Sequence, residues 1–146
     1  GKLRVRASVR DDRHRQPHHG AGAWKGDGVQ LALAIPGQGG FWEFGLSRHD
    51  DGQVEINVYS VPVGMRWTPA DGGAALKVEG RGGRLEYEFA VDAASLGVTP
   101  AVAKSGFRFN LLVNDDDGEG RDGWIAIAPG IGDGKDPAKY PFVVFE

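Results

Sequence analysis

Residues 2–10 carry the feature that most limits what this chain can fold into, an alternation of apolar and polar side chains. Leucine, valine or alanine occupies each odd position from Leu3 to Val9, and lysine, arginine or serine each even one. Because successive side chains on a strand point to opposite faces, the pattern predicts a strand with one face on a core and the other in water. Helical periodicity is almost absent from the sequence.

The alternation recurs along the chain, punctuated by 24 glycines and eight prolines. It predicts further strands near residues 29–35, 42–46, 54–58, 76–78, 85–91, 107–113, 124–127 and 141–145. Turns at 49–52 and 80–83 predict two hairpins, and Asp92 and Gly97 predict the cap and the stop of one short helical turn. About eight strands predict an all-β fold, a two-sheet antiparallel β-sandwich or jelly-roll-like arrangement.

The bulk composition excludes several function classes. A length of 146 residues predicts a single domain, residues 1–146. The net charge of −3 provides no basic field for a phosphate backbone, so no nucleic acid partner is expected. The chain has no cysteine, which excludes disulfides and thiolate chemistry. No apolar run approaches the ~20 residues that a membrane helix needs, so no membrane partner is expected either.

Three stretches, in order, resemble family 9 carbohydrate-binding modules. They are Trp-Lys-Gly-Asp-Gly-Val-Gln-Leu at 24–31, the strand at 106–115 that ends in Val-Asn-Asp, and Lys-Asp-Pro-Ala-Lys-Tyr at 135–140. The resemblance extends from Leu3 to Phe145. It implies a β-sandwich of the wider DOMON-like group, structural calcium, and recognition of glycan chain ends between aromatic rings.

The resemblance also implies a setting for the chain. Such a module is non-catalytic and belongs to a secreted polysaccharide-degrading protein with an adjoining catalytic domain, such as a glycoside hydrolase or lyase. Because the chain starts at Gly1 and the likeness lacks the family's first strands, we expect an N-terminally incomplete fragment. The expected ligand is a plant or algal polysaccharide, either xylan or cellulose, or an acidic glycan paired with Lys25, Arg48 and Arg66.

Three positions depart from the family's pattern. Gly134 stands where the family's sugar binders carry a second tryptophan, Gly45 replaces an arginine, and Leu112 replaces a glutamine. One wall of the aromatic clamp is therefore absent, and a different glycan or a weakened site is an alternative.

Six side chains are candidates for contact with a sugar. An aromatic ring suits the apolar C–H face of a pyranose, and planar polar groups suit its hydroxyls. Trp24 lies outside any alternation and is expected to be exposed, whereas Trp42 is expected in the core and Trp124 behind the acidic loop. The alternatives are that Trp24 plugs the end of the sandwich, that Trp67 packs in the core, and that the polar residues form a solvated face. The six candidates are Trp24, Gln30, Glu43, Asn57, Tyr59 and Trp67.

The loop at 114–122 is densely acidic, with five carboxylates in nine positions. Calcium prefers six to eight hard oxygen ligands, and glycines allow the sharp turn that such a loop needs. The predicted ligands are Asp115, Asp117, Glu119 and Asp122, which Asp11 and Asp12 could join. The alternative is a solvated loop without an ion.

Three histidines, His14, His18 and His19, share one loop at spacings that zinc or nickel could use. Glycan contact or simple exposure to solvent are the alternatives. Because three histidines in one loop are weak evidence for a metal, these two alternatives are preferred.

Three other function classes stay open. Glu43, Glu55, Glu86 and Glu88 lie on strand faces, so a glycosidase pair is sterically possible, but no catalytic motif singles one out. A structural accessory domain that buttresses a catalytic domain would bind nothing. A DOMON-type haem domain would use Met65, the only methionine, with a histidine.

Overall fold

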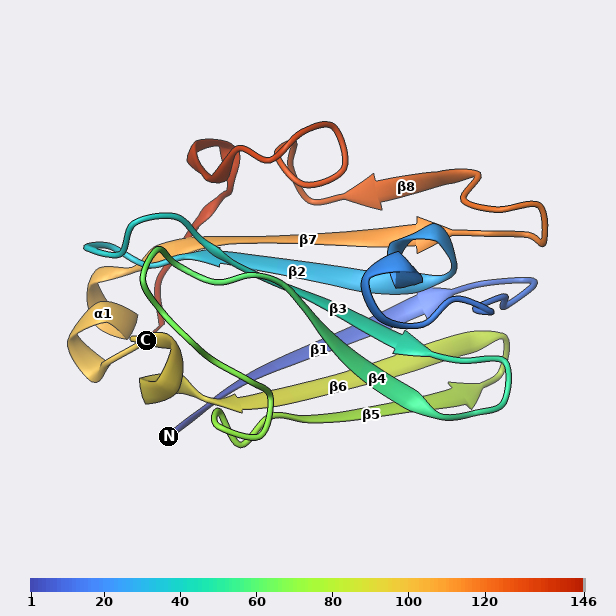
Figure 1. Ribbon diagram of the computed structural model, residues 1–146, viewed down its shortest axis with the longest axis horizontal. Coiled ribbons are helices and arrows are strands. Elements are labelled where there is room, and N and C mark those ends of the chain that lie inside the picture. The colour runs from blue at the N-terminus through green and yellow to red at the C-terminus, as the bar shows by residue number, and fades with distance from the viewer. Residues whose placement is uncertain (146) are drawn as a thin grey trace.

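The computed structural model describes residues 1–145 and contains nine strands in two antiparallel sheets. Figure 1 shows most of the strands running along the long axis of the molecule, with few helical turns. The predicted all-β sandwich is confirmed. None of the helices in the described residues is long and apolar enough to cross a membrane.

The smaller sheet has three strands in the order β1-β6-β5. These are β1 (Lys2–Arg10), β5 (Ala75–Arg81) and β6 (Arg84–Asp92). The β5–β6 hairpin turns at Gly82 and Gly83, whose φ angles of 59° and 75° suit glycine. Burial alternates along β1 and β6, as the period-two pattern predicted.

The larger sheet has six strands, five of them in the order β4-β3-β2-β7-β8. The short β9 pairs with the start of β7, and β8 pairs with its end, so the two share one edge of β7. The predicted antiparallel β3–β4 hairpin is confirmed, with Gly52 at φ 88° in its turn. The strands are β2 (Gly28–Ala34), β3 (Trp42–Arg48), β4 (Val54–Ser60), β7 (Phe107–Asp115), β8 (Gly123–Ala126) and β9 (Phe142–Val143).

The core fills the space between the sheets. Trp42 and Phe44 of the larger sheet are fully buried against the inner face of the smaller one, where Phe44 and Phe89 have ring centroids 5.7 Å apart. The prediction that Trp42 is a core residue is confirmed. Trp67 joins this cluster, with its ring 5.3 Å from that of Phe44.

Helical turns are more numerous than the sequence predicted. The turn expected at 92–97 exists as η2 (Ala93–Leu96) and stops at Gly97 with φ 83°, but the Asp92 carboxylate does not cap it and instead pairs with Lys2 at 2.8 Å. The additional elements are η1 (Gly20–Lys25), α1 (Pro100–Ser105) and η3 (Pro137–Lys139).

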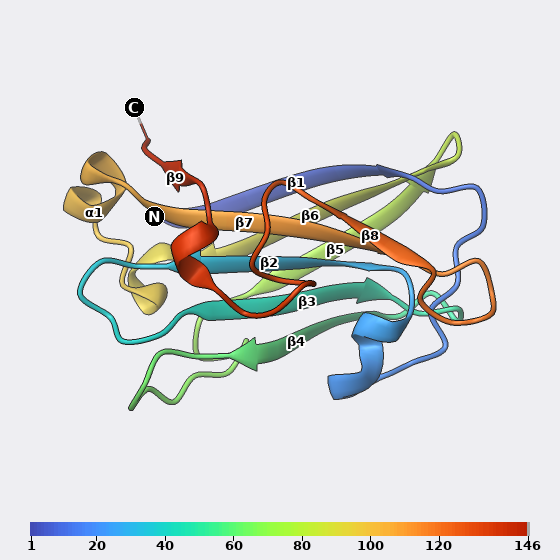
Figure 2. The same ribbon diagram turned by 90° about the horizontal axis from the view of Figure 1, so that it is seen from above.

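The outer face of the larger sheet is covered, unlike that of the smaller sheet. Figure 2 shows η1 and the segment after β8 lying over strands of this sheet. Under that segment, a second apolar cluster forms from Ala32, Leu112, Ile131 and Tyr140. The first six residues of both β2 and β3 are therefore buried, whichever face they point to.

Candidate functional site

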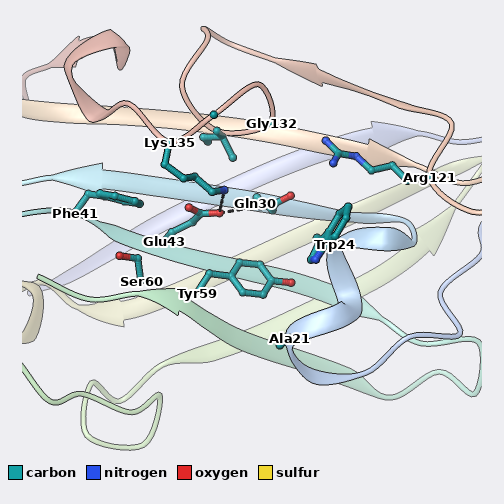
Figure 3. A pocket seen from close by; sticks show the side chains of 12 residues that line it. Ala21, Trp24, Gln30, Phe41, Glu43, Tyr59, Ser60, Arg121, Gly132 and Lys135 are labelled. Carbon is teal, nitrogen blue, oxygen red and sulfur yellow. Dashed lines mark hydrogen bonds and ion pairs between the residues drawn. The ribbon is translucent and has the colours of Figure 1, made fainter.

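A cavity of about 520 Å³ opens on the outer face of the larger sheet, between η1 and the segment 131–135. Figure 3 shows side chains from η1, β2, β3, β4 and the segment after β8 pointing toward it. The cavity gathers aromatic, amide, carboxylate and cationic groups in one place, and it is lined by Ala21, Trp24, Gln30, Phe41, Glu43, Tyr59, Ser60, Arg121, Ile131, Gly132, Gly134 and Lys135.

Trp24 forms one wall of the cavity from η1 (Figure 3). Its side chain is 40% exposed, so the predicted exposure of this ring is confirmed. Two cations lie near the indole, the Lys25 ammonium at 5.8 Å and the Arg121 guanidinium at 5.4 Å from the ring centroid. The Trp24 ring therefore offers an apolar surface that is flanked by two positively charged groups.

The floor of the cavity is a buried polar network on adjacent strands. The Gln30 amide donates to Glu43 Oε1 at 2.8 Å, and the Asn114 amide donates to Gln30 Oε1 at 2.7 Å. Lys135 Nζ donates to Glu43 Oε1 at 2.6 Å (Figure 3). The other carboxylate oxygen of Glu43 is buried without a partner in the described residues. Gln30 and Glu43 were both predicted candidates, and the structure brings them together as a prepared acceptor site.

Tyr59 occupies the space that Gly45 leaves open. A Cβ atom at Gly45 would lie 2.6 Å from the Tyr59 ring, so the arginine-to-glycine difference makes room for this tyrosine. Burial raises the pKa of Tyr59 to about 12, with further raising by Glu43 and Glu55 and partial lowering by a backbone hydrogen bond with Trp24. Tyr59 therefore keeps its proton at neutral pH and can donate a hydrogen bond into the cavity.

Arg121 is a lining residue that the sequence reasoning missed. Its guanidinium lies 4.4 Å from the centroid of Trp124, so it stands between Trp24 and Trp124. Its Nε and Nη2 atoms are buried and have no hydrogen-bond partner in the described residues, and desolvation lowers its pKa. A guanidinium with unpaired donors beside a cavity has an affinity for oxyanions.

Trp124 was predicted to pack behind the acidic loop, and its ring does pack against Arg121 of that loop, although it is not buried there. Its side chain is 45% exposed and its indole lies against Gly132, where a Cβ atom would come within 2.6 Å of the ring. Stacking on Arg121 holds the ring at the rim of the site instead.

The side of the cavity near Gly134 is open. A Cβ atom there would meet nothing within 4 Å, and the backbone has a φ of 118° that favours glycine. The absence of the family's second tryptophan thus leaves a real gap. Phe41, another lining residue that the sequence reasoning missed, packs edge-on against Tyr140.

Two predicted sugar contacts do not line the cavity. Trp67 packs against Trp42 and Phe44, and its indole N–H donates to Ser95, so the core alternative holds for it. Asn57 lies on the outer face of β4, and its amide nitrogen is buried without a hydrogen-bond partner in the described residues, away from the cavity lining. The structure therefore brings together four of the six candidates, Trp24, Gln30, Glu43 and Tyr59.

The acidic loop assembles in part as predicted. Carboxylate oxygens of Asp115, Asp117 and Asp11 lie within 4.8 Å of one another. Desolvation, then repulsion from Asp117, Asp11 and other carboxylates, raises the pKa of Asp115. Asp122 instead accepts a hydrogen bond from the Asp117 amide, and Glu119 stands outside the cluster. The donor set of hard oxygens fits calcium.

The three histidines of the loop before η1 do not assemble into one group, so the disfavoured metal alternative for this trio does not hold in the described residues. His14 lies 3.5 Å from Asp27 and 3.7 Å from Asp11, whereas His19 stacks on His49 with ring centroids 3.8 Å apart. These histidines lie near the start of β4, and Met65 follows the end of that strand, so the residues expected of a haem site are separated by the strand's length.

Comparison with known proteins places the fold. No family model matches the sequence, and no curated protein matches it. The structure resembles a family 9 carbohydrate-binding module from Caldicellulosiruptor kristjanssonii in complex with cellotriose, with a TM-score of 0.71 and 15% identity, over 97% of this chain and 67% of the other. It also resembles a Bacteroides uniformis protein with a provisional description as carbohydrate-binding, with a TM-score of 0.59 and 13% identity, over 99% of this chain and 72% of the other. The chain thus has the fold of family 9 modules.

Proposed function

We propose that this chain is a non-catalytic carbohydrate-binding module whose ligand occupies the cavity between η1 and residues 131–135. The observation that carries the proposal is the half-exposed indole of Trp24 beside the buried Gln30–Glu43 pair in one cavity. The fold supports it, because the family 9 module with this fold was crystallised with cellotriose.

The cavity offers the two kinds of contact that a pyranose needs. The Trp24 ring can stack on the apolar C–H face of the sugar. The buried Glu43 carboxylate orients the Gln30 amide and the Lys135 ammonium in the cavity, and the Tyr59 hydroxyl can donate to a sugar hydroxyl. Hydrogen bonds within the floor hold the carboxylate in place, so little reorganisation is needed on binding.

The cationic groups favour an acidic glycan over neutral xylan or cellulose. The unpaired Arg121 donors can form a paired hydrogen bond with a uronate carboxylate. Lys25 also lies near Trp24. Arg66 and Arg48, the other two cations expected to favour an acidic glycan, do not line the cavity.

A calorimetric titration tests both the function and the ligand class. Cellotriose, xylotriose and trigalacturonate would each be titrated into the wild-type protein and into Trp24→Ala, Arg121→Ala and Arg66→Ala. We expect trigalacturonate to bind most tightly. Trp24→Ala should weaken binding of every bound sugar by about fivefold, since an aromatic contact is worth ~1 kcal/mol.

The two arginine variants test the preference for an acidic sugar separately from the question of whether the protein binds sugars. Arg121→Ala should remove the preference for the acidic sugar, and the exposed Arg66 serves as the matched control. Equal binding of neutral and acidic sugars would reject the uronate preference alone. If the protein bound neither these sugars nor any polysaccharide, the binding function would be rejected, and a structural accessory domain would be the remaining interpretation.

We also propose calcium as a structural ion held by Asp11, Asp115 and Asp117. Excess calcium at 100 times its dissociation constant would stabilise the fold by about 2.7 kcal/mol. Thermal unfolding with calcium and with a chelator measures this difference. Asp117→Asn should abolish it, whereas Glu119→Gln, outside the cluster, should not.

A secreted polysaccharide-degrading protein with an adjoining catalytic domain is the setting we propose for this module. In this setting, binding of a glycan to the module would keep the adjoining catalytic domain close to its substrate. Sequencing the gene upstream of the codon for Gly1 tests it, and a neighbouring domain without a glycan-related fold would contradict it.

A further inference from the structure

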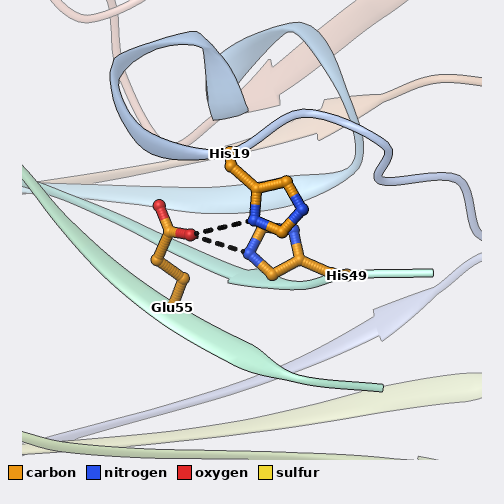
Figure 4. Close-up of side chains that lie close together, drawn as sticks. All are labelled: His19, His49 and Glu55. Carbon is orange, nitrogen blue, oxygen red and sulfur yellow. Dashed lines mark hydrogen bonds and ion pairs between the residues drawn. The ribbon is translucent and has the colours of Figure 1, made fainter. Parts of the chain in front are cut away.

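Two histidines and a glutamate converge at the start of β4, outside the cavity and outside the acidic loop. His19 Nδ1 lies 3.4 Å and His49 Nε2 lies 2.9 Å from the same oxygen, Oε2 of Glu55. Figure 4 shows both ring nitrogens directed at that carboxylate, from the loop before η1 and from the β3–β4 turn. Three potential ligands from three separate segments therefore face one point.

Two of the three separations between these ligand atoms are close to what a transition metal requires, and all three lie within 4.8 Å. Zinc lies about 2.1 Å from imidazole nitrogen and carboxylate oxygen, so two of its ligands at a tetrahedral angle are about 3.4 Å apart. The observed separations of 2.9 and 3.4 Å are close to this value. Imidazole ligands favour zinc, copper and nickel over calcium.

We propose that His19, His49 and Glu55 form a binding site for a divalent first-row transition ion such as Zn²⁺. Two histidines and one glutamate leave a fourth coordination position, and the His19 side chain is 60% exposed, so this position faces water. The site is distinct from the calcium cluster, with which it shares no residue.

The surroundings hold one ligand in place and limit the affinity. Glu55 Oε1 accepts from the Gly20 amide at 2.6 Å, which leaves Oε2 directed at the histidines. When Nε2 of His49 binds the metal, its proton moves to Nδ1, which is buried and has no acceptor in the described residues. We therefore expect weaker binding than in structural zinc sites whose histidines have such an acceptor.

The metal site also connects to the glycan site. η1 begins directly after His19 and ends with Trp24 and Lys25. Glu55 accepts a hydrogen bond from the Gly20 amide at the start of η1, and Tyr59, on the same face of β4, lines the cavity together with Trp24. A metal ion bound to His19 and Glu55 would fasten η1 to β4, so zinc should increase glycan affinity. This part rests on the proposed function.

Calorimetry with Zn²⁺ tests the site. The chelator-treated protein would be titrated in excess Ca²⁺, together with His19→Ala, Glu55→Gln and the control His18→Ala. His19 is exposed, and the glutamine in Glu55→Gln keeps an oxygen for the Gly20 amide, so both variants should fold. We expect His19→Ala and Glu55→Gln to lower zinc affinity by at least ~10-fold and His18→Ala to leave it unchanged.

The outcomes distinguish this site from the other ones. Absence of zinc binding to the wild type, or equal affinity and stoichiometry in His19→Ala, would overturn the proposal. The second result would assign any bound zinc to the His14 group. The zinc isotherm needs no sugar, so failure of glycan binding leaves it intact. Glycan titrations with and without zinc then test the coupling separately.

Discussion

The two sheets share one core but differ on their outer faces. Along β1 and β6 of the smaller sheet, burial alternates, and the outward side chains are mostly charged and are exposed or partly exposed. Along β2 and β3 of the larger sheet, the outward positions are buried and hold Gln30, Glu43 and Ser47. The first outer face is solvated, and the second is covered by η1 and the segment after β8 (Figure 2).

This difference separates structural from functional polar residues. Burying a polar group costs free energy unless it is hydrogen-bonded, so buried amides and carboxylates are seldom placed on a sheet without a reason. On the larger sheet they form a network that opens into the cavity. The covered face is thus the one where we place recognition, and the solvated face contributes to the fold alone.

The largest expected effect tests what the sheets have in common. Phe44→Ala and Phe89→Ala remove buried rings from the inner faces of the larger and the smaller sheet. Each should lower the free energy of unfolding by ~3–5 kcal/mol, as measured by chemical denaturation. A difference of more than about 2 kcal/mol between the two would contradict a core shared equally by both sheets.

A pair of glutamates tests how the outer faces differ. Glu43→Ala leaves the buried Gln30 amide and the Lys135 ammonium without their acceptor, and should cost ~2 kcal/mol. Glu88→Ala on the smaller sheet removes only a half-exposed partner of Arg6 and should change stability by less than ~0.5 kcal/mol. Urea unfolding measures both. Similar costs would show that the two faces do not differ in this way.

A pair of strand glycines sharpens the comparison. In Gly45→Ala the new methyl group meets the Tyr59 ring, so we expect a loss of ~1 kcal/mol. Gly80 of β5 has only ordinary contacts at 3.5 Å or more, so Gly80→Ala should be neutral or stabilise by ~0.5 kcal/mol. Thermal unfolding would report the two shifts, and shifts of the same sign would count against a tyrosine packed over Gly45.

The smallest expected effect is the coupling energy between two interacting side chains on each outer face. A double-mutant cycle on Arg6 and Glu88, whose charged atoms are 3.5 Å apart on exposed side chains, should give a coupling below ~0.5 kcal/mol. The same cycle on Gln30 and Glu43 should give ~1 kcal/mol, since that hydrogen bond is buried. Equal couplings would argue that burial does not strengthen the network.

Alternation predicted the strands well because it reports which face of a strand meets the core. It does not report whether something covers the other face, so Glu43 and Glu88 read alike in the sequence although one is buried and the other exposed. The coverage comes from η1 and from residues distant in sequence. Arg121 could not be placed for the same reason, because its stacking on Trp24 joins segments nearly a hundred residues apart.

Some helical turns were predictable and others were not. The helix α1 has an N-cap at Thr99, a proline at its first position and Gly106 at its end, all of which were visible in the sequence and overlooked. By contrast, η1 has no side-chain cap, so tertiary contacts with β4 rather than local signals place it. Trp24 was recognised as exposed because it lies outside any alternation, which required no knowledge of η1.

The attachment of η1 to β4 at its start bears on the thermodynamics of recognition. Because the Gly20 amide is already bonded to Glu55 in the folded chain, the backbone that presents the indole is ordered before a ligand arrives. Association then begins from a rigid platform, and the heat capacity change on binding should reflect desolvation of the ring alone rather than any coupled ordering of the chain.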